Sequence, residues 1–332
     1  MSSALTPSVR VLRGPDAGAS TLADDVRAGF QKPLKELPPK HLYDELGSQL
    51  FDRICTLPEY YPTRTERAIL EREADRIAAL TDAAELVELG SGTAAKTRVL
   101  MDALNANGTL RTYVGFDIEE QIVRDTAQRL ALEYPELAGI EGVVGDFEAD
   151  LMMLEPAATD TRRLIALLGG TIGNFVEEPR RRLLGSIADM MGPDDHLLLG
   201  TDLVKDPHVI EAAYDDAAGV TASFNLNVLE IINRELEADF PVENFAHVAR
   251  FDRDREWLEM RLAAQHACQV RIDALDLQVD FAEGEEIRTE ISAKFTRARI
   301  EADLRTAGLE PVELMSDPEG LYALTLARPV NG

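Results

Sequence analysis

A strand that ends in a glycine turn and continues as a helix constrains this chain more than any other feature of its sequence. Residues 86–97, LVELGSGTAAKT, begin as an apolar run and break at two closely spaced glycines. Sheets that bind nucleotides commonly open in this way, because glycine lets the backbone and a ligand approach each other closely. The segment predicts a parallel sheet with a nucleotide, a phosphate or a nucleoside bound beyond its first strand.

The segments that follow repeat the alternation of strand and helix. Apolar runs are separated by amphipathic helices such as residues 119–134 and 177–191. The expected strands are residues 84–89, 112–118, 140–147, 163–170 and 196–204. This rhythm is typical of a parallel sheet. Residues 310–330 then form two strand-like runs around an Asp-Pro-Glu-Gly turn, which predicts a terminal β-hairpin.

The rhythm breaks between residues 205 and 294. Helices are expected at 207–220 and 227–240, followed by a β-rich passage over 256–292. We interpret this stretch as an inserted second domain. The predicted domains are a ligand-binding domain of residues 65–204 and 295–332, an α+β domain of residues 20–64 and 205–294, and a loosely ordered N-terminus of residues 1–19.

The composition of the chain excludes several classes of function. The 332 residues are 45% hydrophobic, and the formal net charge of -26 repels nucleic acid and anionic lipid. Cys55 and Cys268 are too few and too far apart for a disulfide framework, and no two histidines have i, i+4 ligand spacing. The first twenty residues have no apolar core for secretion, so we expect no signal peptide, and no apolar run reaches membrane-spanning length. We expect a cytoplasmic monomer that acts on a small molecule, without a metal, nucleic acid or a membrane.

The glycine turn has more than one interpretation. Residues 90–95, GSGTAA, satisfy the dinucleotide pattern G-x-G-x-x-G/A, and a turn that needs glycine only for close packing is the alternative. Glu88, two residues before Gly90, suits a cation or a hydroxyl better than a pyrophosphate. Lys96 either pairs with a ligand carboxylate or lies on the solvent face of the helix.

Two further strand ends favour a nucleoside. Asp117 ends the second strand, where a carboxylate accepts both ribose hydroxyls. Asp146 and Phe147 end the third strand and offer an acceptor for an adenine amine beside an aromatic face. Ribose and adenine contacts without a phosphate clamp suggest S-adenosylmethionine (SAM), a sulfonium cation without phosphate.

The fourth strand leads into LLGGTIGNF, residues 167–175. Ligands of parallel sheets bind beyond the carboxyl ends of the strands. Gly169 and Gly170 allow a close backbone approach there, and Asn174 offers both a donor and an acceptor. The alternative is a glycine-rich turn in which Asn174 caps the next helix.

The order of several longer motifs is more specific than the glycine turn. They are LPPKHLYDELGSQLFDRICTLPEYYPTRTE, LVELGSGTAAKTR, GTIGNF, LLLGTDLVKD, AYDDAAGVTASFNLNVL and GEEIRTEISAKF. In sequence and order these stretches resemble the histidine Nα-methyltransferases of ergothioneine biosynthesis, from about residue 22 to the terminal hairpin. The resemblance implies a class I SAM-dependent methyltransferase fold, a Rossmann-like doubly wound sheet with a terminal antiparallel hairpin, plus a second α+β substrate-binding domain.

The resemblance also implies an activity and a set of site residues. Three successive transfers from SAM would convert L-histidine to Nα,Nα,Nα-trimethylhistidine (hercynine), leaving S-adenosylhomocysteine. The residues implied to hold the cofactor are Gly90, Lys96, Asp117, Asp146 and Phe147. The residues implied to bind the amino-acid carboxylate are Asn174 and Tyr214, with Gly169 lining the same pocket. Those implied to grip the imidazole are Tyr60, Glu290 and Ser292, and Tyr43 would lie near the reacting amine.

The chemistry of these residues agrees with the implied substrate. Glu290 and Ser292 are two residues apart on an expected strand and face the same side, so both can reach one imidazole nitrogen. Tyr43 and Asn174 would orient the amine without a dedicated base, and Tyr43, Tyr60 and Phe51 are candidates to attract a quaternary ammonium product.

Three residues depart from the family pattern. Gly170 stands where the family has Ser, Leu42 where it has Trp, and Arg261 where it has an aromatic residue. The other functions considered are Nα-methylation of tryptophan or tyrosine, an NAD-dependent oxidoreductase and a catalytically silent scaffold.

Overall fold

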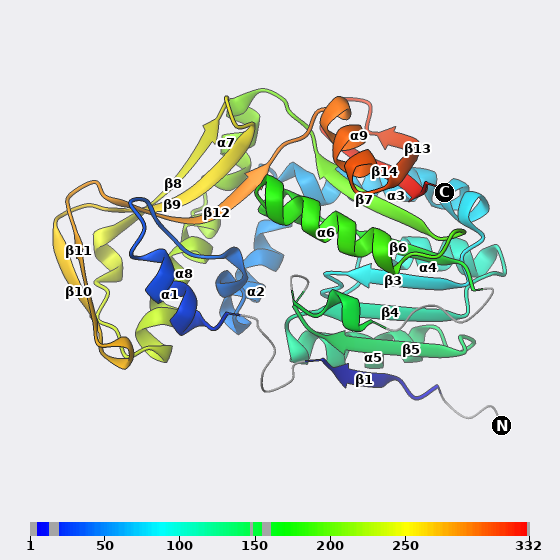
Figure 1. Ribbon diagram of the computed structural model, residues 1–332, viewed down its shortest axis with the longest axis horizontal. Coiled ribbons are helices and arrows are strands. Elements are labelled where there is room, and N and C mark those ends of the chain that lie inside the picture. Colours follow the sequence, from blue (N-terminus) through cyan, green and yellow to red (C-terminus); the bar gives the residue numbers. More distant parts are fainter. Residues whose placement is uncertain (1–4, 13–19, 147–148, 155–160, 331–332) are drawn as a thin grey trace. The chain divides into compact units, whose positions relative to one another are not determined.

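The computed structural model describes the chain except for residues 1–4, 13–19, 147–148, 155–160 and 331–332 (Figure 1). The chain forms two compact units. Unit 1 consists of residues 1–19, 65–203 and 295–332, and unit 2 of residues 20–64 and 204–294.

Unit 1 is built on an eight-stranded sheet with the order β1-β5-β4-β3-β6-β7-β14-β13. Its strands are β1 (Ser8–Val11), β3 (Glu85–Leu89), β4 (Thr112–Asp117), β5 (Gly139–Val144), β6 (Arg163–Leu167), β7 (His196–Asp202), β13 (Leu309–Ser316) and β14 (Tyr322–Pro329). The strands from β1 to β7 are parallel, and β14 runs antiparallel to both β7 and β13. After β1 at one edge of the sheet, the chain enters the middle at β3, moves outward through β4 and β5, and crosses to the other side of β3 at β6. This order, with its terminal hairpin, confirms the predicted class I methyltransferase fold.

Along the chain, the helices of unit 1 lie between its strands or lead into them. They are α3 (Tyr61–Thr81), which begins in unit 2, α4 (Arg98–Ala106), α5 (Glu120–Glu133), α6 (Glu177–Met190) and α9 (Arg297–Thr306), with short 3-10 helices η2 (Leu151–Met153) and η3 (Thr171–Asn174). Strand β6 is buried along its whole length, as expected for a parallel strand covered on both faces. Its one charged residue, Arg163, is compensated by Asp195, with 3.0 Å between Arg163 Nε and Asp195 Oδ2.

Part of residues 1–19, for which the sequence predicts a loosely ordered N-terminus, forms a short strand. Ser8–Val11 forms β1, which lies along β5 in parallel register, with Val9 opposite Gly142 (Figure 1). The strand has only four residues and none of them is fully buried. Its sequence therefore carries little of the apolar pattern by which strands are predicted.

Unit 2 combines two small sheets with helices. The four-stranded sheet has the order β2-β12-β9-β8, and β10 and β11 form an antiparallel pair. Its elements are α1 (Leu22–Gly29), β2 (Lys35–Glu36), η1 (Pro39–Leu42), α2 (Glu45–Ile54), α7 (Pro207–Tyr214), α8 (Val220–Glu235), η4 (Val242–Asn244), β8 (Phe245–Asp252), β9 (Trp257–Ala264), β10 (Cys268–Ile272), η5 (Asp273–Leu275), β11 (Leu277–Phe281) and β12 (Glu286–Ala293). The sequence predicted a β-rich passage at 256–292 and did not predict β8.

The helix expected over residues 207–220 is interrupted. Helix α7 ends at Tyr214, and α8 begins at Val220 after Gly219, whose φ is +71°. The Asp216 carboxylate accepts hydrogen bonds from the backbone N–H groups of Val220 and Thr221, at 3.0 and 2.7 Å. This cap stabilises the start of a new helix and leaves Tyr214 at the end of the preceding one.

The helices of the described residues include none with the length and apolar character needed to cross a bilayer. The same residues contain no group of three or more His, Cys, Asp or Glu side chains placed to hold a metal ion.

Candidate active site

The glycine turn of unit 1 lies between β3 and α4. Gly90 and Gly92 have φ angles of +78° and +46°, which residues with a side chain rarely adopt. The N–H groups of Gly90 and Ser91 donate to the carbonyl oxygen of Phe116, and that of Gly92 donates to Asp117 Oδ2 at 2.8 Å. The turn is therefore bonded to the end of β4, and the Asp117 carboxylate lies against it.

Asp117 is held in place by backbone donors. Besides Gly92, the N–H groups of Ile118 and Glu119 donate to its Oδ1, at 2.8 and 3.2 Å. Burial raises the pKa of the Asp117 carboxyl, and the three backbone hydrogen bonds oppose this shift. These hydrogen bonds fix the carboxylate that the sequence predicts to accept the ribose hydroxyls.

Glu88 is part of the turn's internal structure. Its carboxylate accepts hydrogen bonds from the hydroxyls of Thr97 and Tyr113, the latter at 2.7 Å. Glu88 is buried, and burial raises the pKa of its carboxyl to about 7, against the lowering effect of the two hydroxyls. These bonds tie β3 to β4 and to the residue preceding α4.

A buried carboxylate joins the glycine turn to the end of β6. The sequence did not indicate it as a site residue. Glu66, in α3, is 0% exposed and forms an ion pair with Lys96. It also accepts hydrogen bonds from the Gly169 N–H and, at 2.8 Å, from the Tyr322 hydroxyl. Lys96 therefore does not lie free on the solvent face of its helix, which was one of its two interpretations.

The residues after β5 are described only in part. Asp146 follows the strand, and its N–H donates to Asp150 Oδ2 at 2.9 Å. Phe147, predicted to stack on adenine, lies outside the described residues.

The segment after β6 has two successive glycines in the left-handed region. Gly169 and Gly170 have φ angles of +77° and +71°, so the chain turns sharply into η3, which ends at Asn174. Helix α6 starts at Glu177, and Val176 occupies its N-cap position. Asn174 is therefore not the helix cap that the alternative interpretation required.

In unit 2, two residues assigned to the substrate are directly bonded. The hydroxyls of Tyr214 and Ser292 lie 2.8 Å apart, and both side chains are buried. Lys294 Nζ donates to both oxygens, at 2.8 Å to Ser292 and 3.1 Å to Tyr214. The sequence did not single out Lys294, although it continues the alternation of Glu290 and Ser292 along the chain.

The backbone of Tyr214 is anchored through a buried chain of hydrogen bonds. The Thr289 hydroxyl donates to Asn225 Oδ1 at 2.5 Å, and Asn225 Nδ2 lies 2.9 Å from His247 Nδ1. The other ring nitrogen, His247 Nε2, lies 2.8 Å from the Tyr214 carbonyl oxygen. Burial lowers the pKa of His247, so its neutral form, with the proton on Nε2, fits these partners.

Aromatic side chains gather around the same residues. The ring of Tyr60 lies 5.9 Å from that of Tyr214 and 6.2 Å from that of Phe51, measured between centroids. Tyr43 contacts Phe51 at 5.5 Å and Phe224 at 5.3 Å. The three residues proposed to attract a quaternary ammonium thus form one cluster, to which the structure adds Phe224.

Glu290 is a buried carboxylate beside this cluster. It is 8% exposed, and it accepts no hydrogen bond from the described part of the chain. Burial raises the pKa of its carboxyl to about 7, and the positive charge of Lys294 opposes the shift. Burial also raises the pKa of the Tyr60 hydroxyl well above its usual value, with Tyr214 and Glu290 among the neighbouring charges that contribute. A donor on a ligand would complete the hydrogen bonding of Glu290.

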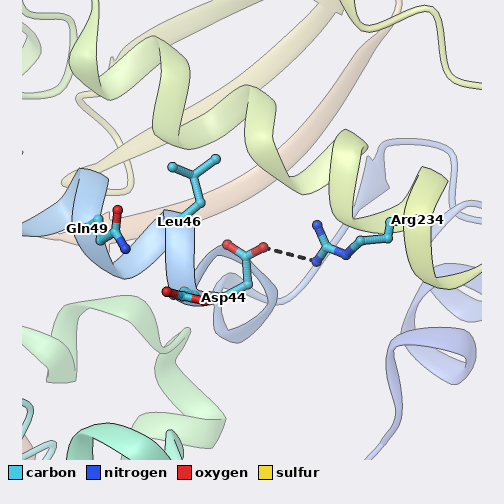
Figure 2. Close-up of a pocket in the computed structure, with 5 residues that line it drawn as sticks. Asp44, Leu46, Gln49 and Arg234 are labelled. Carbon is cyan, nitrogen blue, oxygen red and sulfur yellow. Dashed lines mark hydrogen bonds and ion pairs between the residues drawn. The ribbon is translucent and has the colours of Figure 1, made fainter.

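The residue after Tyr43 fixes the start of α2. Asp44 accepts hydrogen bonds from the Gly47 N–H and from Asn227 Nδ2, both at 2.8 Å, and forms an ion pair with Arg234 at 3.0 Å. Figure 2 shows this pair in a surface pocket of unit 2. The pocket contains none of the predicted site residues, so we assign to Asp44 the role of holding the Tyr43 segment on α8.

The predicted site residues therefore fall into two groups. Unit 1 contains Gly90, Lys96, Asp117, Asp146, Gly169 and Asn174, and unit 2 contains Tyr43, Tyr60, Tyr214, Glu290 and Ser292. Within unit 2 the structure brings all five together through ring contacts, the Tyr214–Ser292 hydrogen bond and the charge of Glu290.

Arg261 is one of the three residues that depart from the family pattern. Its guanidinium group forms ion pairs with the carboxylates of Glu259 and Glu286.

The surroundings of the glycine turn fit a cationic nucleoside better than a dinucleotide. The Gly92 amide, which a pyrophosphate would use, already donates to the carboxylate of Asp117. A sulfonium group is compatible with acidic neighbours, whereas phosphates are repelled. The fold and this turn together define a SAM-dependent methyltransferase of class I.

Comparison with known proteins identifies the family. Residues 22–329 match the model of the histidine-specific, SAM-dependent methyltransferases, and the chain belongs to this family. It is 48% identical to histidine N-alpha-methyltransferase of Mycolicibacterium smegmatis, over 97% of this chain and 99% of that protein. It is also 31% identical to ergothioneine biosynthesis protein 1 of Neurospora crassa, over 89% of this chain and 33% of that protein. An L-tryptophan methyltransferase of Psilocybe serbica is 30% identical, over 92% of each chain.

Proposed function

We propose that this enzyme transfers three methyl groups in succession from SAM to the α-amino nitrogen of L-histidine. The product is Nα,Nα,Nα-trimethylhistidine (hercynine), a step of ergothioneine biosynthesis. The observation that carries the proposal is Glu290, a buried carboxylate without a hydrogen-bond partner among the described residues, beside the Ser292 hydroxyl. An imidazole N–H supplies the donor that this carboxylate lacks.

The cofactor would be held by the residues of the glycine turn. Lys96, which pairs with Glu66, is proposed to meet the carboxylate of the methionyl part, and Asp117, which accepts from the Gly92 N–H, is proposed to accept the ribose hydroxyls. Gly90 allows the close approach, while Asp146 and Phe147 are proposed to contact the adenine. SAM supplies an electrophilic methyl group on a positively charged sulfur.

A second set of polar groups is proposed to hold the amino acid. Asn174 and Tyr214 are proposed to bind its carboxylate, with Gly169 lining the pocket. Tyr60, Glu290 and Ser292 are proposed to bind the imidazole.

Positioning accounts for most of the catalysis in this proposal. The amine lone pair displaces a neutral leaving group in line, so little electrophilic assistance is needed, and correct orientation is worth roughly 7–11 kcal/mol. The amine must be unprotonated, and an α-amino group of pKa about 7.7–8.0 is partly so near neutral pH. Tyr43 and Asn174 orient the amine, and its protons leave through water.

Tryptophan is the second candidate substrate, because the Psilocybe serbica relative is named for it. An indole N–H also donates to a carboxylate, so Glu290 alone does not separate the two amino acids. Indole has no second ring nitrogen, and the Ser292 hydroxyl would then lack a partner on the ring.

Mass spectrometry of the products tests the proposal directly. The enzyme is incubated with SAM and an equimolar mixture of histidine, tryptophan and tyrosine. We expect mono-, di- and trimethylated histidine to form in sequence while the other two amino acids remain unmodified. Preferential methylation of tryptophan or tyrosine would replace histidine as the substrate, and methylation of none would overturn the proposal. We further propose that the enzyme is cytoplasmic and acts as a monomer.

A further inference from the structure

Unit 2 contains a lysine that is completely buried and points at the proposed substrate residues. Lys294 follows β12 directly and is 0% exposed. Its ammonium group donates to Ser292 Oγ at 2.8 Å and to Tyr214 Oη at 3.1 Å, and lies 4.7 Å from the centroid of the Tyr214 ring. Its charge also acts on the Glu290 carboxyl, whose pKa it lowers against the effect of burial.

Burial of an ammonium group is costly unless charges and hydrogen bonds compensate it. Lys35, in the same unit, pairs with the Glu285 carboxylate and lies over the Phe281 ring. The hydrogen bonds of Lys294 include two to hydroxyl groups that the proposed function assigns to the amino acid. These two contacts connect its charge to the proposed substrate residues.

The ammonium determines how the two hydroxyls are oriented. An ammonium group has N–H donors and no acceptor, so Tyr214 Oη and Ser292 Oγ both accept hydrogen bonds from it. The proton of each hydroxyl must therefore point away from Lys294. A hydroxyl that accepts from a cation is polarised and becomes a stronger donor to a third group.

We propose that Lys294 is a positioning residue for the amino-acid substrate. The Tyr214 and Ser292 hydroxyls lie 2.8 Å apart and one donates to the other, so Lys294 holds the pair with one remaining hydroxyl proton directed toward an acceptor group of a zwitterionic ligand. It acts through these hydroxyls and does not itself touch the substrate. The inference rests on the proposed function, because it assumes that Tyr214 and Ser292 bind an amino acid.

Replacement of the charge separates this role from a purely structural one. The test compares Lys294→Met, which keeps an unbranched apolar side chain and removes the ammonium group, with Lys35→Met as the matched control in the same unit. KM is measured for histidine and for SAM with each protein. We expect Lys294→Met to raise KM for histidine about tenfold or more, as expected for a charge-assisted hydrogen bond, and KM for SAM less than twofold. Lys35→Met should leave both constants unchanged.

A double variant tests whether Lys294 acts through Tyr214. If it does, Lys294→Met should change KM for histidine much less in a Tyr214→Phe background than in the wild type, because the hydroxyl it orients is absent. Fully additive effects, or an equal rise of KM for histidine and for SAM, would overturn the proposal.

Two further outcomes are decisive. Lys294→Gln keeps a donor without the charge and is used if the Met variant does not fold. Loss of folding in both variants, with Lys35→Met folded, would make Lys294 a stability element and overturn the inference. If the wild type methylates a different amino acid, the same constants are measured for that substrate. Failure of the wild type to methylate any amino acid would refute the proposed function itself, whereas an active wild type with an unaltered Lys294→Met variant would refute only the inference.

Discussion

The backbone N–H of Gly169 donates to both carboxylate oxygens of Glu66, at 2.8 and 3.0 Å. The same carboxylate pairs with Lys96 and accepts a hydrogen bond from the Tyr322 hydroxyl. One fully buried side chain of α3 thus connects the glycine turn, the end of β6 and the terminal hairpin. Glu66 therefore contacts both Lys96, which is proposed to hold the cofactor, and Gly169, which is proposed to line the amino-acid pocket.

Removal of that support should destabilise the protein strongly. We expect Glu66→Ala to lower the free energy of unfolding by about 3–5 kcal/mol, because it leaves the Lys96 ammonium and the Gly169 amide without their buried partner. Tyr322→Phe is the matched control, since it removes one hydrogen bond of the same network and should cost about 1 kcal/mol. Urea unfolding followed by circular dichroism measures both values. An equal loss in the two variants would show that Glu66 is an ordinary buried acceptor.

Glu290→Ala should weaken binding of histidine selectively. The lost charge-assisted hydrogen bond is worth about 1.5–3 kcal/mol, so we expect KM for histidine to rise roughly 10- to 100-fold while KM for SAM changes little. Glu286→Ala is the control on the same strand, because Glu286 pairs with Arg250 and Arg261. Steady-state kinetics with both substrates varied gives the comparison. An unaltered KM for histidine would remove Glu290 from the imidazole site.

The same carboxylate should give binding a pH dependence. Burial raises the pKa of Glu290 to about 7 in the free protein, and only the deprotonated form accepts a hydrogen bond from a ring N–H. As the pH rises through about 7, KM for histidine should therefore fall. The substrate's own titration adds to this profile, so the quantity to measure is the difference between the wild type and Glu290→Gln. Parallel profiles for the two proteins would contradict the assignment.

Glu88 should make stability depend on pH with the opposite sign from an ordinary paired carboxylate. Its folded pKa of about 7 lies above the value of 4.5 expected when the chain is unfolded, so between these values the folded state binds more protons. The stabilisation is complete below about pH 4.5 and is lost as the pH rises through about 7. The Glu88→Gln variant should lack this decline, and the change in free energy of unfolding relative to the wild type should reach about 3 kcal/mol. Denaturant unfolding between these pH values measures it, and identical pH slopes would refute it.

The parallel strands were predictable because burial on both faces gives them continuous apolar sequences. Strand β6 is fully buried, and β3 and β7 are buried except at their first residue. Strand β8 was missed for the opposite reason. Most of its residues are half-buried, and its sequence FAHVARFD mixes charged, polar and apolar residues without a clear period.

The site was predictable only where a residue belonged to a recognisable motif. Glu66 lies in a charged stretch of α3, TERAILEREADR, in which any carboxylate resembles a surface residue. Its burial arises from contacts with Gly169 and Tyr322, which are distant in the sequence. Lys294 carried a weaker signal, since it follows Glu290 and Ser292 at the same two-residue spacing. A lysine at the end of a strand is ordinarily exposed, and only the packing of α7 shows otherwise.

The hydroxyl of Tyr43 should affect catalysis without affecting packing. Tyr43→Phe keeps the ring contacts to Phe51 and Phe224 and removes only the group proposed to orient the amine. We expect each methylation to slow about 2- to 10-fold, as for one neutral hydrogen bond. Time-resolved mass spectrometry of the mono-, di- and trimethylated products gives the three rates. If all three remain unchanged, Tyr43 does not orient the amine.

Phe51 should affect mainly the later steps. Its ring lies 5.5 Å from that of Tyr43 and 6.2 Å from that of Tyr60, so it belongs to the cluster proposed to attract a quaternary ammonium. Phe51→Leu retains the apolar volume and removes one ring face, which is worth about 0.5–2 kcal/mol toward a desolvated cation. The third methyl transfer creates a charge that deprotonation cannot remove, whereas the amines formed by the first two can lose a proton. We therefore expect the dimethylated intermediate to accumulate in this variant while the first transfer keeps its rate. Equal slowing of all three transfers would instead indicate that Phe51 only supports the position of Tyr43.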